Sequence, residues 1–355
     1  MIAGCIMLVR HGFRRIPVLA PSSKAFVGEA SAGECSDVPT LPGSGSGSTQ
    51  KTTSYLVSRW MTTAGAPDFL STGNSSLLPV PKARKLTAMA AFANLRKAFD
   101  LTSRNYIVTG GAQGIGFAIV DAIAQMGGNV VAMDIKDKPG QDFSALSKQY
   151  GVNAQYIQAD VTSEESLTGA FKKSINVLGG LDGCVTCAGL ALEKPFEETG
   201  WQEARRIHDV NVTGTYFTAQ LAASQMQKQG NGGSLVLISS ITAHTVLPSH
   251  HMSAYGATKG AVKTLSESLA VELAPHRIRV NTISPGFIDT EMTQEVRKAK
   301  PSMAEVFEKR PPLQRMGRRD DLTGAVVYLL GDAASYTTGA DIAITGGLHV
   351  GRINT

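Results

Sequence analysis

The chain has 355 residues, of which 43% are hydrophobic and 18% charged, and its formal net charge is +5. This length allows one large core, and no apolar run reaches the ~18–20 residues that a membrane-spanning helix needs. Lys and Arg are scattered instead of forming a basic stripe with interleaved aromatic residues, so the composition argues against both a membrane protein and a nucleic-acid-binding protein.

Residues 1–98 differ in composition from the rest of the chain. They are rich in Ser, Thr, Gly and Pro, poor in acidic residues, and include the low-complexity run 42–48. Such a segment cannot bury enough apolar surface to offset the entropy of ordering it. We therefore predict a flexible extension over 1–98 and a single folded domain over 99–355.

The beginning of this extension has the composition of an organelle transit segment. Residues 2–20 mix apolar residues with three arginines, and no acid precedes Glu29. The alternative is an inert extension, because Met89 would be a natural start just before the domain. The sequence thus predicts a cytoplasmic protein, or a mitochondrial one if residues 2–20 are a transit peptide.

Within the domain, strand-like apolar runs alternate with helical stretches. The strands are expected at 106–109, 129–134, 154–158, 183–186, 234–239, 277–283 and 341–344. The helices are expected at 115–126, 142–150, 164–178, 201–229, 254–273 and 321–330. This alternation predicts an α/β fold: a single doubly wound domain with a seven-stranded parallel sheet and helices on both faces.

A glycine-rich turn joins the first expected strand to the first helix. Its glycines let the backbone approach a phosphate closely, and the first N–H groups of the helix favour an anion. The spacing G-x-x-x-G-x-G differs from the commoner G-x-G-x-x-G fingerprint, and an ordinary strand-to-helix turn is the alternative. We predict a pyrophosphate cradle made of Gly110, Gln113, Gly114, Ile115 and Gly116.

The second strand ends in Asp134, 18 residues after Gly116. In a doubly wound sheet this position faces the adenosine ribose, where a carboxylate accepts hydrogen bonds from both hydroxyls. The carboxylate would repel a 2′-phosphate, so Asp134 favours NAD and leaves NADP as the alternative cofactor. A surface acid is the other interpretation of Asp134, because Lys136 and Lys138 follow it closely.

Two further strand ends carry candidate cofactor contacts. The third strand is followed by Asp160 and Val161, which can hold and flank the adenine edge, and the fourth by Cys187, Ala188 and Gly189, which are small enough for a ring or ribose to approach. Because the carboxyl ends of parallel strands meet at one edge of the sheet, we expect one binding crevice there.

A second constellation carries the candidate chemistry. Tyr255 and Lys259 are four residues apart on an expected helix, so they share a face. A nearby cation lowers the pKa of a phenol and makes it usable for proton transfer. Ser240 directly follows the fifth strand, where its hydroxyl can bind a substrate oxygen.

The sequence offers neither a metal site nor a disulfide framework. Cys184 and Cys187 form a C-x-x-C without a second pair, and they end an apolar run, so we predict two buried thiols. The His and Met residues of the chain lack the spacing of metal ligands.

Together these residues resemble the short-chain dehydrogenase/reductase family. The resemblance covers about residues 101–347 and rests on seven motifs in the family's order. They are Thr109-Gly-x-x-x-Gly-x-Gly116, Asp160-Val161, Cys187-Ala-Gly189, Asn211-Val-Thr-Gly214, Ser240, Tyr255-x-x-x-Lys259 and Pro285-Gly286. The resemblance implies a Rossmann fold and an enzyme that moves a hydride between NAD(H) and a secondary alcohol or ketone.

The resemblance also implies a role for each candidate residue. Tyr255 would be the general acid/base on the substrate oxygen, and Lys259 would lower its pKa and bind the nicotinamide ribose. Ser240 would orient the substrate oxygen, and Asn211 would hold a water in a proton relay behind Lys259. The residues lining the nicotinamide, with the last at its carboxamide, would be Pro285, Gly286, Ile288 and Thr290.

The family usually forms dimers or tetramers through two long helices, here 201–229 and 254–273, so the resemblance implies a homodimer or homotetramer. Small residues expected to face outward would permit close packing: Ala222, Ala223, Ala257 and Ala261. Residues 290–312 lie where the family carries a substrate lid.

Two positions depart from the family's pattern. Cys187 stands where the family usually has Asn, so a contact that braces the backbone or binds the ribose is lost or replaced. Ser240 lies two residues farther from Tyr255 than the family's serine usually does. At the usual spacing the residue that corresponds to that serine would be Thr242. We prefer Ser240 because it ends a strand and the loop 243–253 can hold the extra residues.

The loop 241–253 and residues 336–339 resemble fungal-type polyol dehydrogenases and sugar reductases, which implies a polyol or sugar substrate. His250 and His251 could border that substrate, although exposed loop histidines are the alternative. Two other functions stay open: an NADPH-dependent reductase of acyl or secondary-metabolite ketones, and a cofactor-binding protein without turnover. Asp134 argues against the first, and the intact catalytic residues argue against the second.

Overall fold

The computed structural model describes residues 94–247, 250–299 and 302–351. Most of the expected extension, including the candidate transit segment, lies outside these residues and stays a prediction. The described part begins with a short helix, α1 (Leu95–Ala98), just before the expected start of the domain at residue 99. Ala98 is buried and its carbonyl lies close to Gly331, so this turn packs with the domain.

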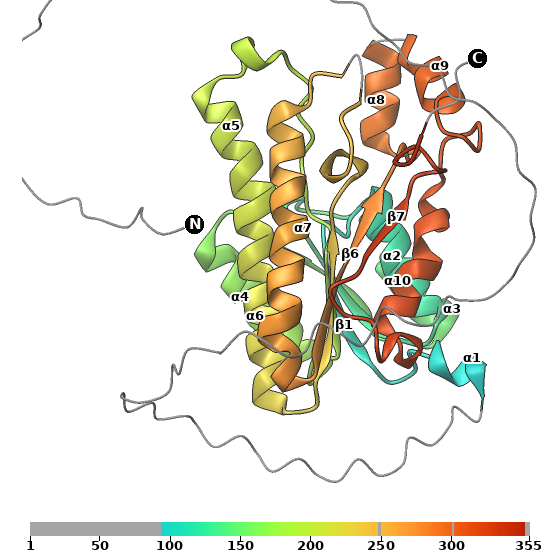
Figure 1. Ribbon diagram of the computed structural model, residues 1–355. Helices are drawn as coiled ribbons and strands as arrows, with labels where there is room; N and C mark the ends of the chain where they lie inside the picture. The colour runs from blue at the N-terminus through green and yellow to red at the C-terminus, as the bar shows by residue number, and fades with distance from the viewer. Residues whose placement is uncertain (1–93, 248–249, 300–301, 352–355) are drawn as a thin grey trace, which may run out of the picture. The chain divides into compact units, whose positions relative to one another are not determined.

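The described residues contain a seven-stranded, all-parallel sheet with the strand order β3-β2-β1-β4-β5-β6-β7 (Figure 1), which confirms the predicted fold. The strands are β1 (Asn105–Thr109), β2 (Asn129–Asp134), β3 (Ala154–Gln158), β4 (Gly183–Thr186), β5 (Gly233–Ile238), β6 (Ile278–Pro285) and β7 (Asp341–Ile344). The chain runs outward from β1 to β3 and then returns to β4 on the other side of β1. Ligands of such sheets bind at this switch point, outside the carboxyl ends of the strands.

Helices cover both faces of the sheet, as predicted (Figure 1). One face packs against α4 (Glu164–Leu178), α6 (Gly214–Gln229) and α7 (Ser253–Leu273). The other packs against α2 (Gly114–Gln125), α3 (Phe143–Tyr150) and α10 (Thr323–Leu330). Side chains alternate between the two cores along each strand, so Val108 faces α2 and its neighbour Ile107 faces α4 and α6.

The expected helix 201–229 is interrupted. It consists of α5 (Trp201–His208), a π-helical turn (Asp209–Thr213) and α6. The turn inserts an extra residue without ending the helix, so the apolar pattern on either side still matches a helix. Asn211 lies inside this turn, and π-helical turns are frequent at functional sites.

The segment 290–312 contains two helices that the sequence analysis did not assign, α8 (Glu291–Ala299) and α9 (Ser302–Lys309). They lie above the carboxyl ends of the strands, beside β6 and β7 in the view of Figure 1. This is the place expected for a lid.

The prediction for the small helix residues was partly wrong. Ala222 and Ala223 are buried in the core between α6 and the sheet, whereas Ala257 is exposed and Ala261 half-buried. The alanine pair of α6 therefore serves helix–sheet packing inside the domain, and only the alanines of α7 are reachable from outside.

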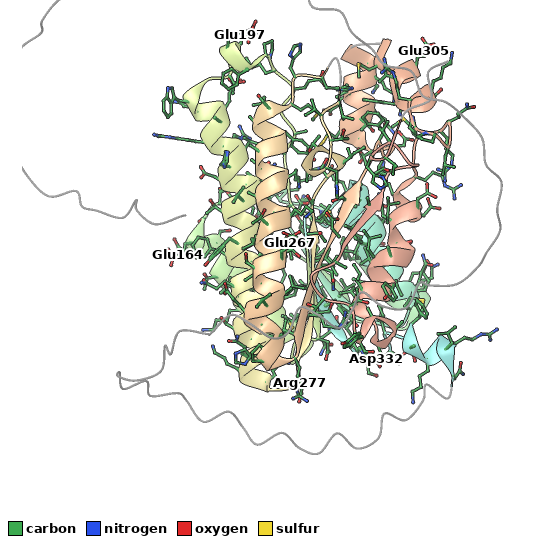
Figure 2. All side chains as sticks on the ribbon, viewed as in Figure 1. Glu164, Glu197, Glu267, Arg277, Glu305 and Asp332 are labelled. Carbon is green, nitrogen blue, oxygen red and sulfur yellow. The ribbon has the colours of Figure 1, made fainter. Side chains whose placement is uncertain are left out.

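Charged side chains occupy the outside of the domain, as Glu164, Glu267 and Arg277 illustrate in Figure 2. Among the helices that the structure describes, none is both long and apolar enough to cross a membrane.

Candidate active site

A cavity of about 1110 Å³ lies at the carboxyl ends of the strands. Every candidate site residue except Asn211 lines it, which brings together the glycine turn, the strand ends of β2 to β6 and the first two turns of α7. Small-molecule pockets usually have volumes of about 300–1,000 Å³, so this one has room for a dinucleotide together with a substrate.

The glycine turn has the geometry of a phosphate cradle. Gly114 is the first residue of α2 and has a φ of +59°, which favours glycine. Among the described residues outside the turn and helix, only the Glu291 carboxylate lies near a Cβ placed there, at 3.5 Å, so the backbone faces the cavity. At Gly116, in contrast, a Cβ would overlap the carbonyl oxygen of Gly110, so this glycine is needed for packing. These residues fit a bound NAD(P).

Asp134 lines the cavity but also supports the glycine turn. Its Oδ2 accepts a hydrogen bond from the Ala112 backbone N–H at 3.1 Å, and its Oδ1 accepts one from the Lys136 N–H at 3.3 Å. The Lys136 ammonium in turn donates to the side-chain oxygen of Gln113. The carboxylate expected at the ribose is therefore accompanied by a cation on the same rim of the cavity.

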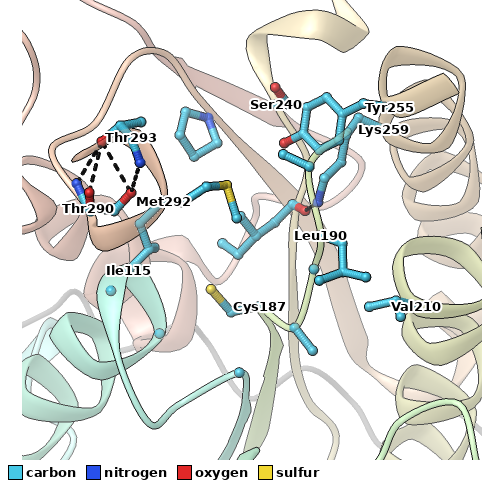
Figure 3. Close-up of a pocket in the computed structure, with 18 of the residues that line it drawn as sticks. Ile115, Cys187, Leu190, Val210, Ser240, Tyr255, Lys259, Thr290, Met292 and Thr293 are labelled. Carbon is cyan, nitrogen blue, oxygen red and sulfur yellow. Dashed lines mark hydrogen bonds between the residues drawn. The ribbon is translucent and has the colours of Figure 1, made fainter. Parts of the chain in front are cut away.

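The end of β4 is held by Thr109. The hydroxyl oxygen of Thr109 accepts hydrogen bonds from the backbone N–H groups of Cys187 at 3.2 Å and Ala188 at 3.4 Å. Cys184 lies in the core, whereas Cys187 is only partly buried and its sulfur points into the cavity (Figure 3). The prediction of two buried thiols is therefore confirmed for Cys184 and only in part for Cys187. Burial raises the pKa of Cys187 to about 12, so its thiol is protonated at neutral pH.

Asp160 and Val161, which were expected beside the adenine, both line the cavity, but the Asp160 side chain is engaged locally. Its carboxylate accepts hydrogen bonds from the Thr162 N–H at 2.9 Å and the Thr162 hydroxyl at 2.7 Å. Val161 packs against Gly214 at the start of α6, so an apolar side chain flanks the cavity at this point.

Ser240, Tyr255 and Lys259 form one cluster on the wall of the cavity (Figure 3). The Lys259 Nζ donates a 2.9 Å hydrogen bond to the Ile238 carbonyl and lies 5.8 Å from the centroid of the Tyr255 ring. Ser240 caps the turn Ile241–Ala243 by accepting from the Thr242 N–H at 3.2 Å, and its hydroxyl lowers the pKa of the Tyr255 phenol. Of the two alternatives, Ser240 is therefore the one with an effect on the phenol.

Burial changes the proton affinities of this cluster. It lowers the pKa of Lys259 from 10.5 to about 8. It also raises the pKa of Tyr255, and the hydrogen bond from Ser240 offsets this only in part. The direction for Tyr255 is opposite to the lowering expected from a neighbouring cation. The reason is that desolvation dominates at this site and also weakens the cation itself.

Asn211 is fully buried and does not line the cavity. Its side-chain amide donates to the Leu190 carbonyl at 2.9 Å and to the Thr258 hydroxyl at 3.0 Å, and its Oδ1 accepts from the Leu190 N–H at 2.8 Å. Asn211 therefore ties the segment after β4 to α7. The relay expected behind Lys259 is not tested by these contacts and stays a prediction.

The residues expected at the nicotinamide, Pro285, Gly286, Ile288 and Thr290, line the cavity one after another between the end of β6 and the start of α8. Gly286 packs so closely on Thr345 that a Cβ would lie 2.7 Å from its Cα. The Thr290 N–H donates to the Thr293 hydroxyl at 2.9 Å, which fixes the first turn of α8 (Figure 3).

Of the two histidines that could border the substrate, only His250 lines the cavity, and for it the alternative of an exposed loop histidine is wrong. Its side chain is only 4% exposed and its ring stacks on Phe307 and Phe287, whereas His251 is exposed as expected. The Nδ1 of His250 lies 3.6 Å from a carboxylate oxygen of Glu193. All four residues of this cluster line the cavity, and they come from segments too far apart for a sequence pattern to join them.

The described residues contain no group of three or more His, Cys, Asp or Glu side chains that could hold a metal ion.

Comparisons with known proteins agree with this geometry. A family profile described as enoyl-(acyl carrier protein) reductase matches residues 110–349. The chain is 35% identical over 252 residues to a sorbose reductase of Schizosaccharomyces pombe, which covers 70% of this chain and 97% of that protein. It is 34% identical over 291 residues to a probable NADP-dependent mannitol dehydrogenase of Yarrowia lipolytica, which covers 79% and 98%. An NADPH-dependent 3-quinuclidinone reductase from Rhodotorula rubra has a similar structure, with a TM-score of 0.69, 32% identity and coverage of 76% and 98%.

Proposed function

The chain belongs to the short-chain dehydrogenase/reductase family and is an NAD(P)-dependent oxidoreductase of alcohols and ketones. From this premise we propose that it transfers a hydride between NAD(H) and a polyol or sugar, with Tyr255 as the general acid/base. The observation that carries the proposal is the cluster of Ser240, Tyr255 and Lys259 in the cavity that also contains the glycine turn.

The side chains of this cluster can perform the proton transfer. Bound NAD(P)(H) would supply or accept the hydride. Tyr255, whose raised pKa keeps it protonated at neutral pH, donates its proton to the oxygen of a ketone and recovers it from an alcohol in the reverse direction. Ser240 holds that oxygen beside the phenol. Lys259, whose ammonium is held on the Ile238 carbonyl 5.8 Å from the centroid of the Tyr255 ring, would bind the ribose of the cofactor.

The cluster of His250 and Glu193 supports a hydroxylated substrate. A carboxylate and an imidazole that line the cavity side by side can accept hydrogen bonds from, and donate them to, the hydroxyl groups of a polyol or sugar. The names of the sorbose reductase and the mannitol dehydrogenase point to the same class of substrate.

Asp134 supports NAD(H) as the cofactor, because its carboxylate would repel a 2′-phosphate. NADP(H) is the alternative, favoured by Lys136 on the same rim and by the cofactors named for two of the similar proteins. Comparing KM for NADH and NADPH decides between them. We expect the lower KM with NADH, and a tenfold lower KM with NADPH would refute this reading of Asp134.

The test of the activity is a panel of polyols, sugars and simple secondary alcohols, followed through the nicotinamide absorbance in both directions. We expect turnover of polyols or ketoses that is lost in Tyr255→Phe. Turnover only of acyl or aromatic ketones with NADPH would instead favour the ketoreductase alternative. NADH binding without any turnover would favour a non-catalytic protein.

We also propose, on the same family premise, that the protein is a homodimer or homotetramer and that residues 1–98 do not contribute to the active site. Sedimentation measures the first. Activity of a chain starting at Met89 tests the second, because loss of turnover in that chain would contradict it.

A further inference from the structure

We propose that Glu291 and Arg319 act in turn at the site of the cofactor phosphates. Without cofactor, the Glu291 carboxylate occupies the position of a phosphate at the glycine turn. When the dinucleotide binds, the carboxylate leaves and Arg319 binds the phosphate in its place. This inference rests on the NAD(P) site proposed above. Neither residue belongs to the motifs that identify the family.

The Glu291 carboxylate lies where an anion is favoured. Glu291 is the first residue of α8, and its Oε2 lies 3.5 Å from the position of a Cβ on Gly114. Gly114 opens α2, whose first N–H groups and dipole attract negative charge. The N-cap residue of α2, Gln113, provides no side-chain cap. The lid carboxylate thus sits at the uncapped positive end of the helix that cradles the cofactor.

Arg319 holds the other oxygen of the same carboxylate. Its Nη2 lies 3.0 Å from Oε1 of Glu291, and its Nε donates to the Asp289 carbonyl at 3.0 Å. Arg319 begins the short 3₁₀ turn Arg319–Leu322, which packs against α2. The carboxylate therefore lies between the N-terminus of α2 and the guanidinium of Arg319. Backbone N–H groups and a guanidinium are also the hydrogen-bond donors that a phosphate group prefers.

A dinucleotide and the Glu291 carboxylate cannot share this position. The pyrophosphate carries about two negative charges, and it must approach the same N–H groups of α2. Like charges repel, so we expect Glu291 to turn away when the cofactor binds. A phosphate that takes the place of the carboxylate then lies against Arg319, which does not itself line the cavity while Glu291 is in place. Because Glu291 opens α8, the exchange also couples cofactor binding to the position of the lid.

The two residues therefore have opposite effects on cofactor binding. A unit charge at roughly 5 Å, with an effective dielectric constant between about 40 and 80, changes a dissociation constant on the order of 4- to 20-fold. We expect Glu291→Gln to lower the Kd for NADH by this factor and Arg319→Gln to raise it by a similar factor. Both effects should shrink at high salt, since the side chains of Glu291 and Arg319 are 47% and 31% exposed.

The experiment is isothermal titration of NADH and NADPH into the full chain and its variants. Glu305→Gln and Arg318→Gln are matched controls, because each removes the same charge from an exposed ion pair, with Lys309 and with Asp320, in which neither partner lines the cavity. Their Kd should stay within twofold of the unchanged chain. Thermal melting verifies that every variant is folded.

The sign of the two changes decides the outcome. If Glu291 and Arg319 only brace the lid, both variants lose the same ion pair and weaken binding together, which overturns the proposal. Unchanged Kd values in both variants overturn it as well, while leaving the NAD(P) site intact. A full chain that binds neither NADH nor NADPH would overturn this inference and the proposed function at once.

Discussion

Replacing Lys259 by Met should make the stability of the protein respond differently to pH. Lys259 is 6% exposed, and burial lowers its pKa from 10.5 to about 8. Below pH 8 the ammonium is charged in both the folded and the unfolded chain, and the folded chain bears the cost of burying it. Above pH 10.5 the amine is neutral in both, and that cost is gone.

Between pH 8 and pH 10.5 the unfolded chain binds more protons at Lys259 than the folded chain does. The contribution of Lys259 to the free energy of unfolding therefore increases with pH. The difference between 10.5 and about 8 corresponds to about 3 kcal/mol. Relative to Lys259→Met, the free energy of unfolding of the unchanged chain should therefore increase by about 3 kcal/mol from pH 7.5 to pH 10.5.

Urea unfolding of both proteins at four pH values in this window measures the effect. The comparison cancels other groups that titrate at high pH, because they are present in both chains, and Met fills a similar volume without a charge. Parallel curves for the two proteins would show that Lys259 keeps an ordinary pKa in the fold. A decrease relative to the variant would mean that its cation is stabilised there, and either result refutes the reasoning from burial.

Three further predictions concern the cavity. Tyr255→Phe should reduce kcat about 10²–10⁴-fold with an unchanged Kd for NADH, since only the proton donor is removed; a loss of NADH binding would place Tyr255 in the fold instead of the chemistry. Gly116→Ala should lower the free energy of unfolding by about 1–3 kcal/mol in urea titrations, because its Cβ would overlap the Gly110 carbonyl; stability equal to that of the unchanged chain would contradict the tight packing. His250→Leu should reduce kcat/KM at least tenfold for polyols but not for simple secondary alcohols of the same length; an equal loss for both would remove His250 from substrate recognition.

The sheet could be predicted from the sequence because its signals are local. Runs such as Leu235 to Ile238 are apolar throughout, as strands covered on both faces must be, and the structure places them in the centre of the sheet. The candidate cofactor residues could also be found locally, because they follow strand ends and those ends meet at one edge.

Other features escaped prediction because they depend on contacts between distant segments. The π-helical turn around Asn211 leaves the helical period of its flanks intact, so only the backbone reveals it. His250 is buried because Phe307 and Phe287 enclose it, and Phe307 comes from α9, a helix that the charged segment 290–312 did not indicate. The Glu291–Arg319 pair joins residues 28 positions apart, at the start of α8 and in the turn Arg319–Leu322.

The hydrogen bond between Asp134 and the Ala112 N–H has a consequence for how this enzyme can change its cofactor. The carboxylate that we propose selects NAD(H) also accepts a hydrogen bond from the backbone of the glycine turn proposed to bind the cofactor. Removing it to admit a 2′-phosphate would leave a backbone donor of the turn without its partner. A change in cofactor preference, by evolution or by engineering, therefore requires a replacement hydrogen-bond acceptor that arises before it or together with it. A single substitution at Asp134 would alter the cofactor preference but would also weaken the glycine turn.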